Sequence, residues 1–289
     1  MPGITPCTKL AWKNHSLDFS KKIYIMGIIN FTPDSFYPGS RISSIDFALT
    51  RAAEMIAEGA DILDIGGEST RPGSLAVDAS EEIKRVVPLI HEIKARHDII
   101  VSVDTKKSGV AAAALEAGTD MINTVAGLRD DDEFARLVAR ADVPVVIMHM
   151  KGIPQSMQDK PFYNDPVAEI SAELESLCAH AMECKVARDK IIIDPGIGFG
   201  KRVSDNLAIL ANIPAFASLG FPILIGLSRK SFLGEVTHRP VEERLAGTVA
   251  AHAMAVAGGV NFLRVHDVAE AVDAAAVAMA IKNAAIKDK

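Results

Sequence analysis

Cysteine is scarce in this sequence, with three residues among 289. We find no C-x-x-C pair and no Cys/His spacing typical of a metal site. Cys178 and Cys184 stand six positions apart in a helical stretch, which separates their directions by about 240° around a helix axis. Such an odd, sparse set of thiols is typical of a reducing compartment. A chain of this length buries about 75% of its unfolded surface, so it needs no disulfide or metal to fold.

A basic excess, a signal peptide and a long membrane-type run are also missing. The 31 basic side chains face 37 acidic ones, and the net charge of −6 argues against a nucleic-acid surface. Residues 1–19 contain no apolar signal core, and the Ala/Gly-rich stretch 246–263 predicts a helix followed by a strand. An apolar fraction of 49%, with only 20 Gly and 14 Pro, excludes disordered and collagen-like chains. We therefore expect a soluble, cytoplasmic, globular protein.

Short β-branched runs alternate with amphipathic helical segments along almost the whole chain. Each run is continuously apolar in its middle, as in a parallel sheet that is buried on both faces. The expected strands are 24–30, 62–68, 99–105, 121–127, 144–150, 191–196, 222–228 and 261–267. Between them, apolar side chains recur at helical spacing, for example over 83–93, where Ser80 is the expected N-cap.

Eight strand–helix units without a linker predict a single α/β domain, the (β/α)₈ TIM barrel. A doubly wound open sheet gives the same local alternation and is the alternative. Length alone would suggest two domains, but barrels of this size are a known exception. We expect the barrel over residues 23–289, with 1–22 as a short N-terminal extension that caps the barrel or forms a hairpin at its amino end.

Polar side chains gather at the predicted carboxyl ends of seven of the eight strands, where barrel enzymes carry their chemistry. One Asp in such a place is usually a helix N-cap, and a lone histidine such as His149 is usually structural. So many polar groups in a dry barrel mouth each need a partner, which favours a functional site. The set includes Asn30, Asp64, Asp104, Asn123, Met148, His149, Asp194, Lys230, Ser231, Arg264 and His266.

Two kinds of ligand fit these residues. Carboxylates at Asp104 and Asp194, with the amide of Asn123, suit a planar heterocycle that carries N–H and NH₂ donors along one edge. The last two strand ends supply cations, and this corner of a barrel usually binds phosphate. Asn30 and Asp34 offer oxygen ligands for Mg²⁺ bridging a phosphate.

The glycine-rich segment 196–201 fits neither G-x-x-x-x-G-K-[ST] nor G-x-G-x-x-G. We expect its glycines to permit a tight turn and a close approach of backbone to ligand.

At these same residues the sequence resembles the dihydropteroate synthase family. The resemblance runs from about Ile23 to the final helix. It rests on MGIINFTPDSF (26–36), GGESTRPG (66–73), SVDT (102–105), the strand with Asn123, DPGIGFGK (194–201), SRKSFLG (228–234) and RVHD (264–267). The chain departs from the family at 37–40, where YPGS replaces the usual Ser-Asp-Gly-Gly.

The resemblance implies an enzyme that joins 4-aminobenzoate to a pterin methyl diphosphate in folate biosynthesis, releasing diphosphate. It implies pterin binding by Asp104, Asn123, Met148, Asp194, Phe199, Lys230 and Arg264, and diphosphate binding by Asn30, Arg264 and His266, with Mg²⁺ near Asn30. It implies that the loops with Thr32, Pro33, Asp34, Thr70, Arg71 and Pro72 close over the aminobenzoate beside Ser231. Asp104, Asp194, Lys230, Arg264 and His266 are then the catalytic set, sulfonamides are inhibitors, and the partner is a second copy in a homodimer.

For the reaction we expect an SN1-like departure of diphosphate, assisted by Mg²⁺, without a covalent enzyme intermediate. The alternatives are a methyltransferase barrel of the methyltetrahydrofolate type, a Schiff-base aldolase using Lys230, and a pterin-binding module without activity. The cationic corner around Lys230 and Arg264 argues against the methyltransferase, which has no diphosphate to hold.

Overall fold

Eight parallel strands form the centre of the molecule in a computed structural model, which describes residues 7–31, 44–69, 76–125, 128–129, 131–152 and 156–286. They are β3 (Tyr24–Asn30), β4 (Ile62–Gly66), β5 (Ile100–Asp104), β6 (Met121–Thr124), β7 (Val145–Met148), β8 (Ile191–Asp194), β9 (Leu224–Gly226) and β10 (Phe262–Val265). Their order is β8-β7-β6-β5-β4-β3-β10-β9, and a parallel bridge between Ile193 and Ile223 links the two ends. The predicted (β/α)₈ barrel is thus confirmed, and the open doubly wound sheet is wrong.

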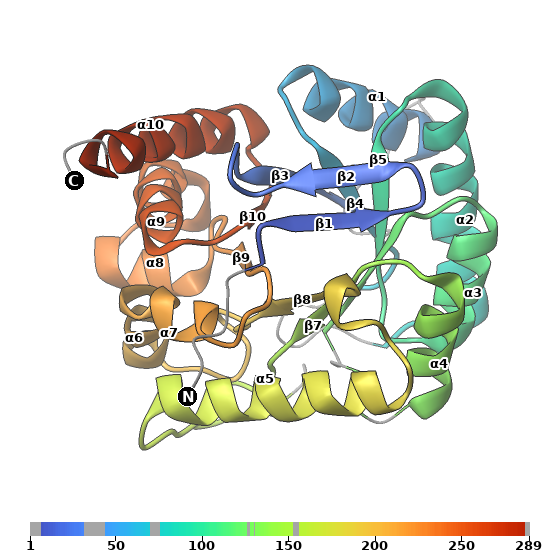
Figure 1. Ribbon diagram of the computed structural model, residues 1–289. Coiled ribbons are helices and arrows are strands. Elements are labelled where there is room, and N and C mark those ends of the chain that lie inside the picture. The colour runs from blue at the N-terminus through green and yellow to red at the C-terminus, as the bar shows by residue number, and fades with distance from the viewer. Residues whose placement is uncertain are drawn as a thin grey trace.

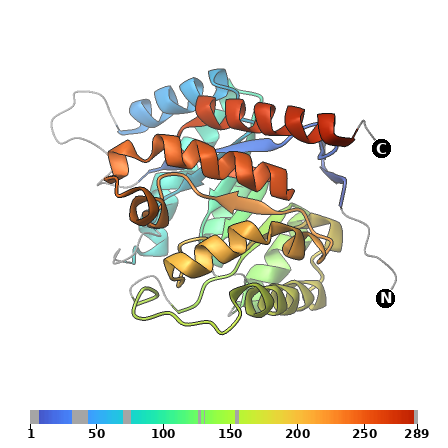
Figure 2. The ribbon, with the colours of Figure 1, turned by 90° about the vertical axis from the view of Figure 1, so that its left-hand side faces the viewer.

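Helices surround the strands in a ring (Figure 1). They are α1 (Ser44–Ala57), α2 (Ala79–Arg96), α3 (Ser108–Glu116), α4 (Asp132–Ala141), α5 (Pro166–Glu183), α6 (Val203–Ala211), α7 (Ile213–Ala217), α8 (Ser231–Thr237), α9 (Leu245–Gly258) and α10 (Val268–Ile286), with 3₁₀ turns η2 (Arg188–Lys190) and η3 (Val241–Glu243). Figure 2 shows α9 and α10 side by side on the outside of the sheet. The segment 246–263 therefore does form a helix and a strand, as expected.

Nearly all residues of these strands are buried, because their apolar side chains face both the barrel interior and the helices. Close packing also fixes a glycine: a Cβ at Gly27 of β3 would stand 2.8 Å from Met55 Sδ of α1. That position lets α1 lie directly against the sheet.

The residues before the barrel form an antiparallel hairpin of β1 (Lys9–Trp12) and β2 (His15–Asp18). Lys190 Nζ donates to Ala11 O at 2.8 Å, and His15 Nε2 lies 3.3 Å from Asp120 Oδ1. Lys190 and Asp120 directly precede β8 and β6, so the hairpin covers the amino ends of the strands. Leu10, Trp12 and Leu17 belong to the same hydrophobic core as the barrel.

Helix starts follow local side-chain chemistry. Asp131 accepts a hydrogen bond from Phe134 N at 2.9 Å, which caps α4 beside the acidic run that follows Arg129. The predicted N-cap Ser80 of α2 is wrong, because the helix begins at Ala79 with Asp78 as its N-cap. Glu81 and Glu82 complement the helix dipole with either start, and the Asp78 side chain makes no capping hydrogen bond, so the path of the backbone sets the start.

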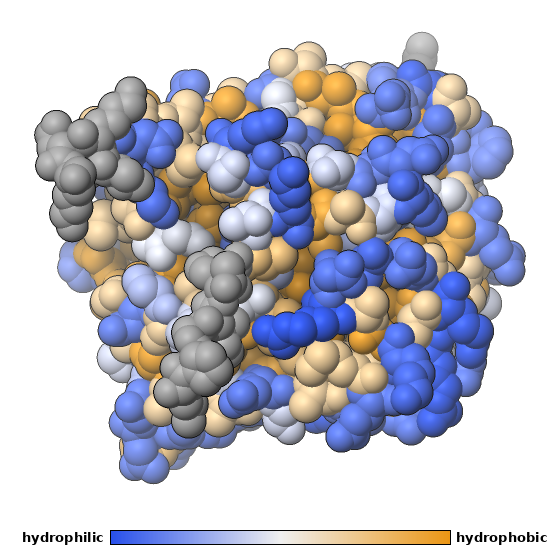
Figure 3. Space-filling model, in the orientation of Figure 1, coloured by the Kyte–Doolittle hydropathy of each residue, from blue (hydrophilic) through white to orange (hydrophobic). Residues whose placement is uncertain are grey.

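The outer surface mixes polar and apolar side chains. Figure 3 shows hydrophilic residues spread over the face that carries the hairpin, with apolar ones between them. Across the described ranges, none of the helices combines the length and hydropathy that a membrane crossing requires.

Candidate active site

The predicted site residues of the described ranges lie together at the carboxyl ends of the strands. Asn30, Asp104, Met148 and Asp194 are the last residues of β3, β5, β7 and β8. Asn123 and Arg264 are the third residues of β6 and β10, Lys230 is the N-cap of α8, and His266 directly follows β10. Thr32, Pro33, Asp34, Thr70, Arg71 and Pro72 lie outside the described residues.

Arg264 links two buried carboxylates. Its Nε donates to Asp64 Oδ2 at 2.6 Å, and its Nη2 donates to Asp104 Oδ2 at 2.8 Å. Asn123 Nδ2 donates to the same Asp64 oxygen at 2.9 Å. One guanidinium therefore organises the ends of β4, β5 and β6.

Each of the two carboxylates has one oxygen that accepts no hydrogen bond from the described residues. Asp64 Oδ1 and Asp104 Oδ1 are shielded from solvent, and no described residue donates to either. Buried polar atoms in native proteins nearly always have a partner, so orphaned ones point to a ligand that completes them. This is the arrangement that a heterocycle with N–H and NH₂ donors would satisfy.

Asp64 was expected among the polar residues of the barrel mouth, but no ligand role was assigned to it from the sequence. Its signal is a charged side chain in the middle of the apolar run ILDIG, completely buried. A buried charge requires a partner, and that requirement alone is enough to flag the residue.

Electrostatics at Asp104 favour the neutral acid. Burial, together with the nearby carboxylates of Asp64, Glu82 and Glu68, raises the pKa of Asp104 to about 7 against the opposing effect of Arg264. Two lysines balance the carboxylates behind it: Lys106 Nζ lies 2.8 Å from Glu68 Oε1, and Lys107 pairs with both Glu68 and Glu82.

Asp194 and Lys230 form a second charged group on the opposite wall. Asp194 Oδ1 accepts from Gly196 N at 2.7 Å. Lys230 donates to Ile197 O, and its Nζ lies 4.7 Å from the centre of the Phe199 ring. Burial raises the pKa of Asp194, opposed mainly by Lys230, and burial lowers the pKa of Lys230 to about 8.

The glycine-rich segment after β8 forms the tight turn that its composition predicted, and its backbone lies against Lys230. Gly196, Gly198 and Gly200 all have positive φ, of 68°, 83° and 62°. A Cβ on Gly196 would stand 2.0 Å from His149 O, so the turn requires glycine there.

Behind the turn, His149 is the structural histidine that its sequence position predicted. Lys201 Nζ lies 2.9 Å from its Nδ1, and its Nε2 lies 3.2 Å from Glu173 Oε2. Burial lowers the pKa of His149, and it also lowers that of Lys201 to about 7. The carboxylate of Glu173 can only accept a hydrogen bond, so the neutral ring carries its proton on Nε2 and Nδ1 accepts from Lys201. Sequence reasoning did not identify Lys201 as part of this support.

Of the two adjacent cations after β9, Arg229 has a structural role and Lys230 faces the site. Arg229 is committed to Asp267 by two hydrogen bonds of 2.9 and 2.8 Å, so Lys230 is the neighbouring cation that turns to the site. His266 N donates to Ser228 Oγ at 3.3 Å, which places His266 beside the cationic corner. Ser231 is exposed at the first turn of α8.

Asn30 lies half-buried at the other side of the mouth. A Cβ on Gly66 would stand 3.7 Å from both Asn30 Oδ1 and Asp104 Cβ, so the glycine leaves Asn30 and Asp104 close together. The amide oxygen of Asn30 is a hard donor of the kind that Mg²⁺ accepts.

Comparisons with known proteins agree with this geometry. The family model described as "Pterin binding enzyme" matches residues 26–266. The dihydropteroate synthase of Haemophilus influenzae is 42% identical over 276 residues, which cover 96% of this chain and 100% of that protein.

Two solved structures have the same fold over nearly their full length. A Yersinia pestis dihydropteroate synthase with a sulfonamide drug complex superposes with a TM-score of 0.90 at 37% identity, covering 95% of this chain and 99% of the other. The Xanthomonas albilineans enzyme with 4-aminobenzoic acid gives a TM-score of 0.89 at 43% identity, covering 95% and 98%. The buried acceptors, the cationic corner and these full-length matches agree: the chain belongs to the dihydropteroate synthase family of pterin-binding transferases.

Proposed function

We propose that this chain condenses 4-aminobenzoate with (7,8-dihydropterin-6-yl)methyl diphosphate, forming 7,8-dihydropteroate and diphosphate. The observation that carries the proposal is the pair of buried carboxylates, Asp64 and Asp104, held by Arg264 with one acceptor oxygen spare on each. This group faces Asp194 and Lys230, so acceptors and cations occur in one mouth.

In this proposal the pterin edge binds at Asp104, Asn123 and Asp194. The pterin presents N–H and NH₂ donors, and a carboxylate accepts two such bonds side by side. Met148 and Phe199 form the walls, and Lys230, beside Phe199, donates to the acceptors of the ring. Binding of these donors to Asp104 favours its anionic form and lowers its pKa.

The diphosphate then lies toward Arg264, His266 and Asn30. A guanidinium beside an imidazole offsets the charge that accumulates on the departing group. Asn30 supplies an oxygen ligand for Mg²⁺, which, when bound with the diphosphate, makes it a better leaving group.

The bond between the pterin methylene carbon and the diphosphate oxygen breaks first, and its electron pair leaves with the diphosphate. The carbocation that forms is conjugated with the pterin ring, and Asp104 and Asp194 stabilise it electrostatically. The aminobenzoate nitrogen attacks this carbon and loses a proton to solvent. Arylamines are unprotonated at neutral pH, so no residue of the chain is required as a base.

Diphosphate release tests the proposal. Purified protein with the pterin methyl diphosphate and Mg²⁺ is expected to release diphosphate only when 4-aminobenzoate is added, with one dihydropteroate formed per diphosphate. Tight pterin binding without release would instead identify a binding module and overturn the proposal.

Positional isotope exchange tests the order of bond making. The substrate carries ¹⁸O between the methylene carbon and the phosphorus, and 4-aminobenzoate is omitted. We expect the label to scramble into the non-bridging positions. No scrambling, combined with a rate that rises steeply with arylamine nucleophilicity, would indicate a direct displacement.

The loops after β3 and β4 are proposed to hold the aminobenzoate beside Ser231. We expect Arg71→Ala to raise the KM for aminobenzoate while pterin diphosphate affinity stays unchanged, and sulfonamides to compete with aminobenzoate. A loss of both substrates in equal measure would contradict this role for Arg71.

We further propose that the protein is a cytoplasmic homodimer. Large apolar side chains are exposed on the neighbouring helices α9 and α10: Met254 by 69%, Val277 by 60% and Ile281 by 66%. Such a surface suits an interface between copies. Light scattering of the purified protein tests this, with a monomer at micromolar concentration as the contrary result.

A further inference from the structure

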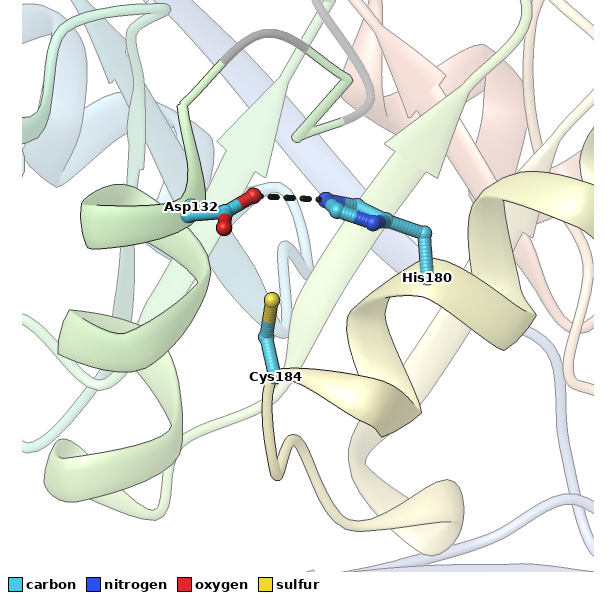
Figure 4. Close-up of side chains that lie close together, drawn as sticks. All are labelled: Asp132, His180 and Cys184. Carbon is cyan, nitrogen blue, oxygen red and sulfur yellow. Dashed lines mark ion pairs between the residues drawn. The ribbon is translucent and has the colours of Figure 1, made fainter.

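A second cluster of metal-type ligands lies outside the barrel mouth, between helices α4 and α5. It consists of Asp132, His180 and Cys184, whose ligand atoms all lie within 4.8 Å of one another. Figure 4 shows the Cys184 sulfur pointing toward the gap between the carboxylate and the imidazole.

The backbone sets this grouping. Asp132 is the first residue of α4, and Cys184 is the C-cap of α5, one helical turn after His180. Cys184 N donates to His180 O at 3.0 Å, and residues four apart share one helix face. We found no Cys/His ligand spacing in the sequence, because the third residue of this group, Asp132, comes from another helix.

The thiol is available for a ligand. All three cysteines lie in the described ranges, and none is bonded to another. Cys184 is 8% exposed, and its sulfur makes no hydrogen bond to the described part of the chain. The Cys184 thiol is therefore nine-tenths buried, has no hydrogen-bond partner among the described residues, and points at an imidazole and a carboxylate.

The imidazole is also incompletely satisfied. His180 Nε2 is shielded from solvent and lies 3.3 Å from Asp132 Oδ1, but no described residue makes a well-aligned hydrogen bond to it. Asp132 Oδ2 is held by Arg136 Nη2 at 3.1 Å, which leaves Oδ1 facing the imidazole. An ion between the two would satisfy both atoms.

We propose that Asp132, His180 and Cys184 bind a zinc-type divalent cation that joins the start of α4 to the end of α5. Imidazole nitrogen, thiolate sulfur and carboxylate oxygen together are typical of Zn²⁺ and Co²⁺, whereas Mg²⁺ and Ca²⁺ take oxygen ligands. Thiolate and carboxylate balance the ion's charge, and water completes the tetrahedron.

The required adjustment is small. Zinc bonds of about 2.0 Å to nitrogen and oxygen and 2.3 Å to sulfur place tetrahedral ligand atoms roughly 3.5 Å apart. Closing from 4.8 Å therefore takes about 1 Å of side-chain movement. Asp132 is exposed, so its side chain has room to move.

Cobalt titration of the full-length protein tests the site. We expect one equivalent of Co²⁺ to produce a near-ultraviolet thiolate-to-cobalt absorption band, which excess Zn²⁺ abolishes because zinc binds more tightly. Cobalt at the oxygen-lined Asn30 site gives no such band, so the two sites are distinguishable. The metal should raise the Tm in proportion to the logarithm of its concentration, and EDTA should reverse the rise.

Matched variants identify the sulfur. Cys184→Ser should remove the band, while Cys178→Ser, six residues earlier along α5, and Cys7→Ser should keep it. Loss of an outer-shell partner alone costs roughly 10- to 100-fold in metal affinity, so His180→Gln should weaken binding at least as much. Asp132→Asn, at the exposed ligand, tests the site without altering the buried thiol.

Three results would overturn the proposal. They are the absence of a band in the parent protein, a band that survives Cys184→Ser, and an equal loss in Cys178→Ser. If Cys184→Ser fails to fold, unchanged cobalt affinity in both His180→Gln and Asp132→Asn decides against it.

Discussion

The two ends of the barrel hold buried carboxylates that differ in how completely they are paired. At the amino end, Asp120 Oδ2 accepts from Lys94 Nζ and from Val101 N, both at 2.9 Å, and Oδ1 lies 3.3 Å from His15 Nε2. At the carboxyl end, Asp64 and Asp104 each keep one buried oxygen that no described residue satisfies. Both ends are buried, so burial does not separate them.

This contrast shows where the fold gives up stability for ligand binding. A fully paired carboxylate holds the hairpin and three elements together, whereas an incompletely paired one is preorganised for a ligand. In barrels the amino end serves stability and the carboxyl end serves chemistry, and these two groups of side chains follow that division.

The largest expected effect comes from removing the shared cation of the carboxyl end. Arg264→Ala leaves Asp64 and Asp104 buried without their partner, and should lower the unfolding free energy by about 3–5 kcal/mol and abolish diphosphate release. Urea denaturation followed by circular dichroism measures the first. The control, Arg140→Ala, breaks the exposed pair with Glu133 and should change stability by less than about 1 kcal/mol. Equal effects of the two variants would refute the role of Arg264.

Asp194→Ala is expected to have the next largest effect, and on binding. Loss of a charged hydrogen-bond partner should weaken pterin diphosphate affinity by about 1.5–3 kcal/mol, or roughly 10- to 150-fold. Titration calorimetry measures this, and Asp120→Ala at the other end should leave the affinity of the folded protein unchanged. Unaltered affinity in Asp194→Ala would remove this residue from the site.

Replacing one carboxylate at each end sharpens the contrast. Asp120→Asn should lower the unfolding free energy by about 1–3 kcal/mol because it breaks a complete set of bonds, while turnover per folded molecule is preserved. Asp104→Asn should do the opposite, losing turnover with a smaller loss of stability. Denaturant midpoints and kcat of both variants provide the measurement, and a reversed pattern would contradict the division of the two ends.

Per pH unit, the smallest expected effect is the pH dependence of stability. The pKa of Asp104 is about 7 in the folded chain against an ordinary 3.8. Between pH 4 and 7 this carboxyl group therefore binds a larger fraction of a proton in the folded state than in the unfolded state. Its contribution to the unfolding free energy therefore falls as pH rises through this window, by at most about 1.4 kcal/mol per unit.

Comparing Asp104→Asn with Asp120→Asn separates the contribution of Asp104 to the pH dependence from that of the other groups. His149, whose pKa burial lowers, acts in the opposite direction near neutral pH, but it is common to all variants. Asp104→Asn should therefore make stability rise more, or fall less, from pH 5 to 7 than in the parent, whereas Asp120→Asn should keep the parent's contribution from Asp104. Identical slopes in Asp104→Asn and the parent would show that Asp104 titrates normally.

Local sequence signals predicted the strands well because each depends on a short apolar run. All eight expected strands are present: Tyr24–Asn30 matches its prediction, and the other seven are one to three residues shorter at one or both ends, as in 62–68 against Ile62–Gly66. The N-cap of α2 was wrong by two residues because Asp78 and Ser80 are both good capping types, and only the path of the backbone selects one.

Local sequence signals could not predict which distant residues pair with one another. SRKS offers two adjacent cations, and the commitment of Arg229 to Asp267, 38 residues away, leaves Lys230 for the site. Asp64 pairs with an arginine that is 200 residues further along the chain. Asp132 meets His180 and Cys184 only because α4 and α5 are neighbours.

By itself the sequence determined the eightfold alternation, the barrel and the set of polar residues at its mouth, since these follow from periodicity and from the family motifs. Which of these residues pair through hydrogen bonds and ion pairs depends on the tertiary structure. Barrel closure brings β10 beside β3 and points Arg264 at the carboxylates of β4 and β5. The energy of a buried charge depends on its nearest partners, and those partners are set by the closed sheet rather than by neighbours in the chain.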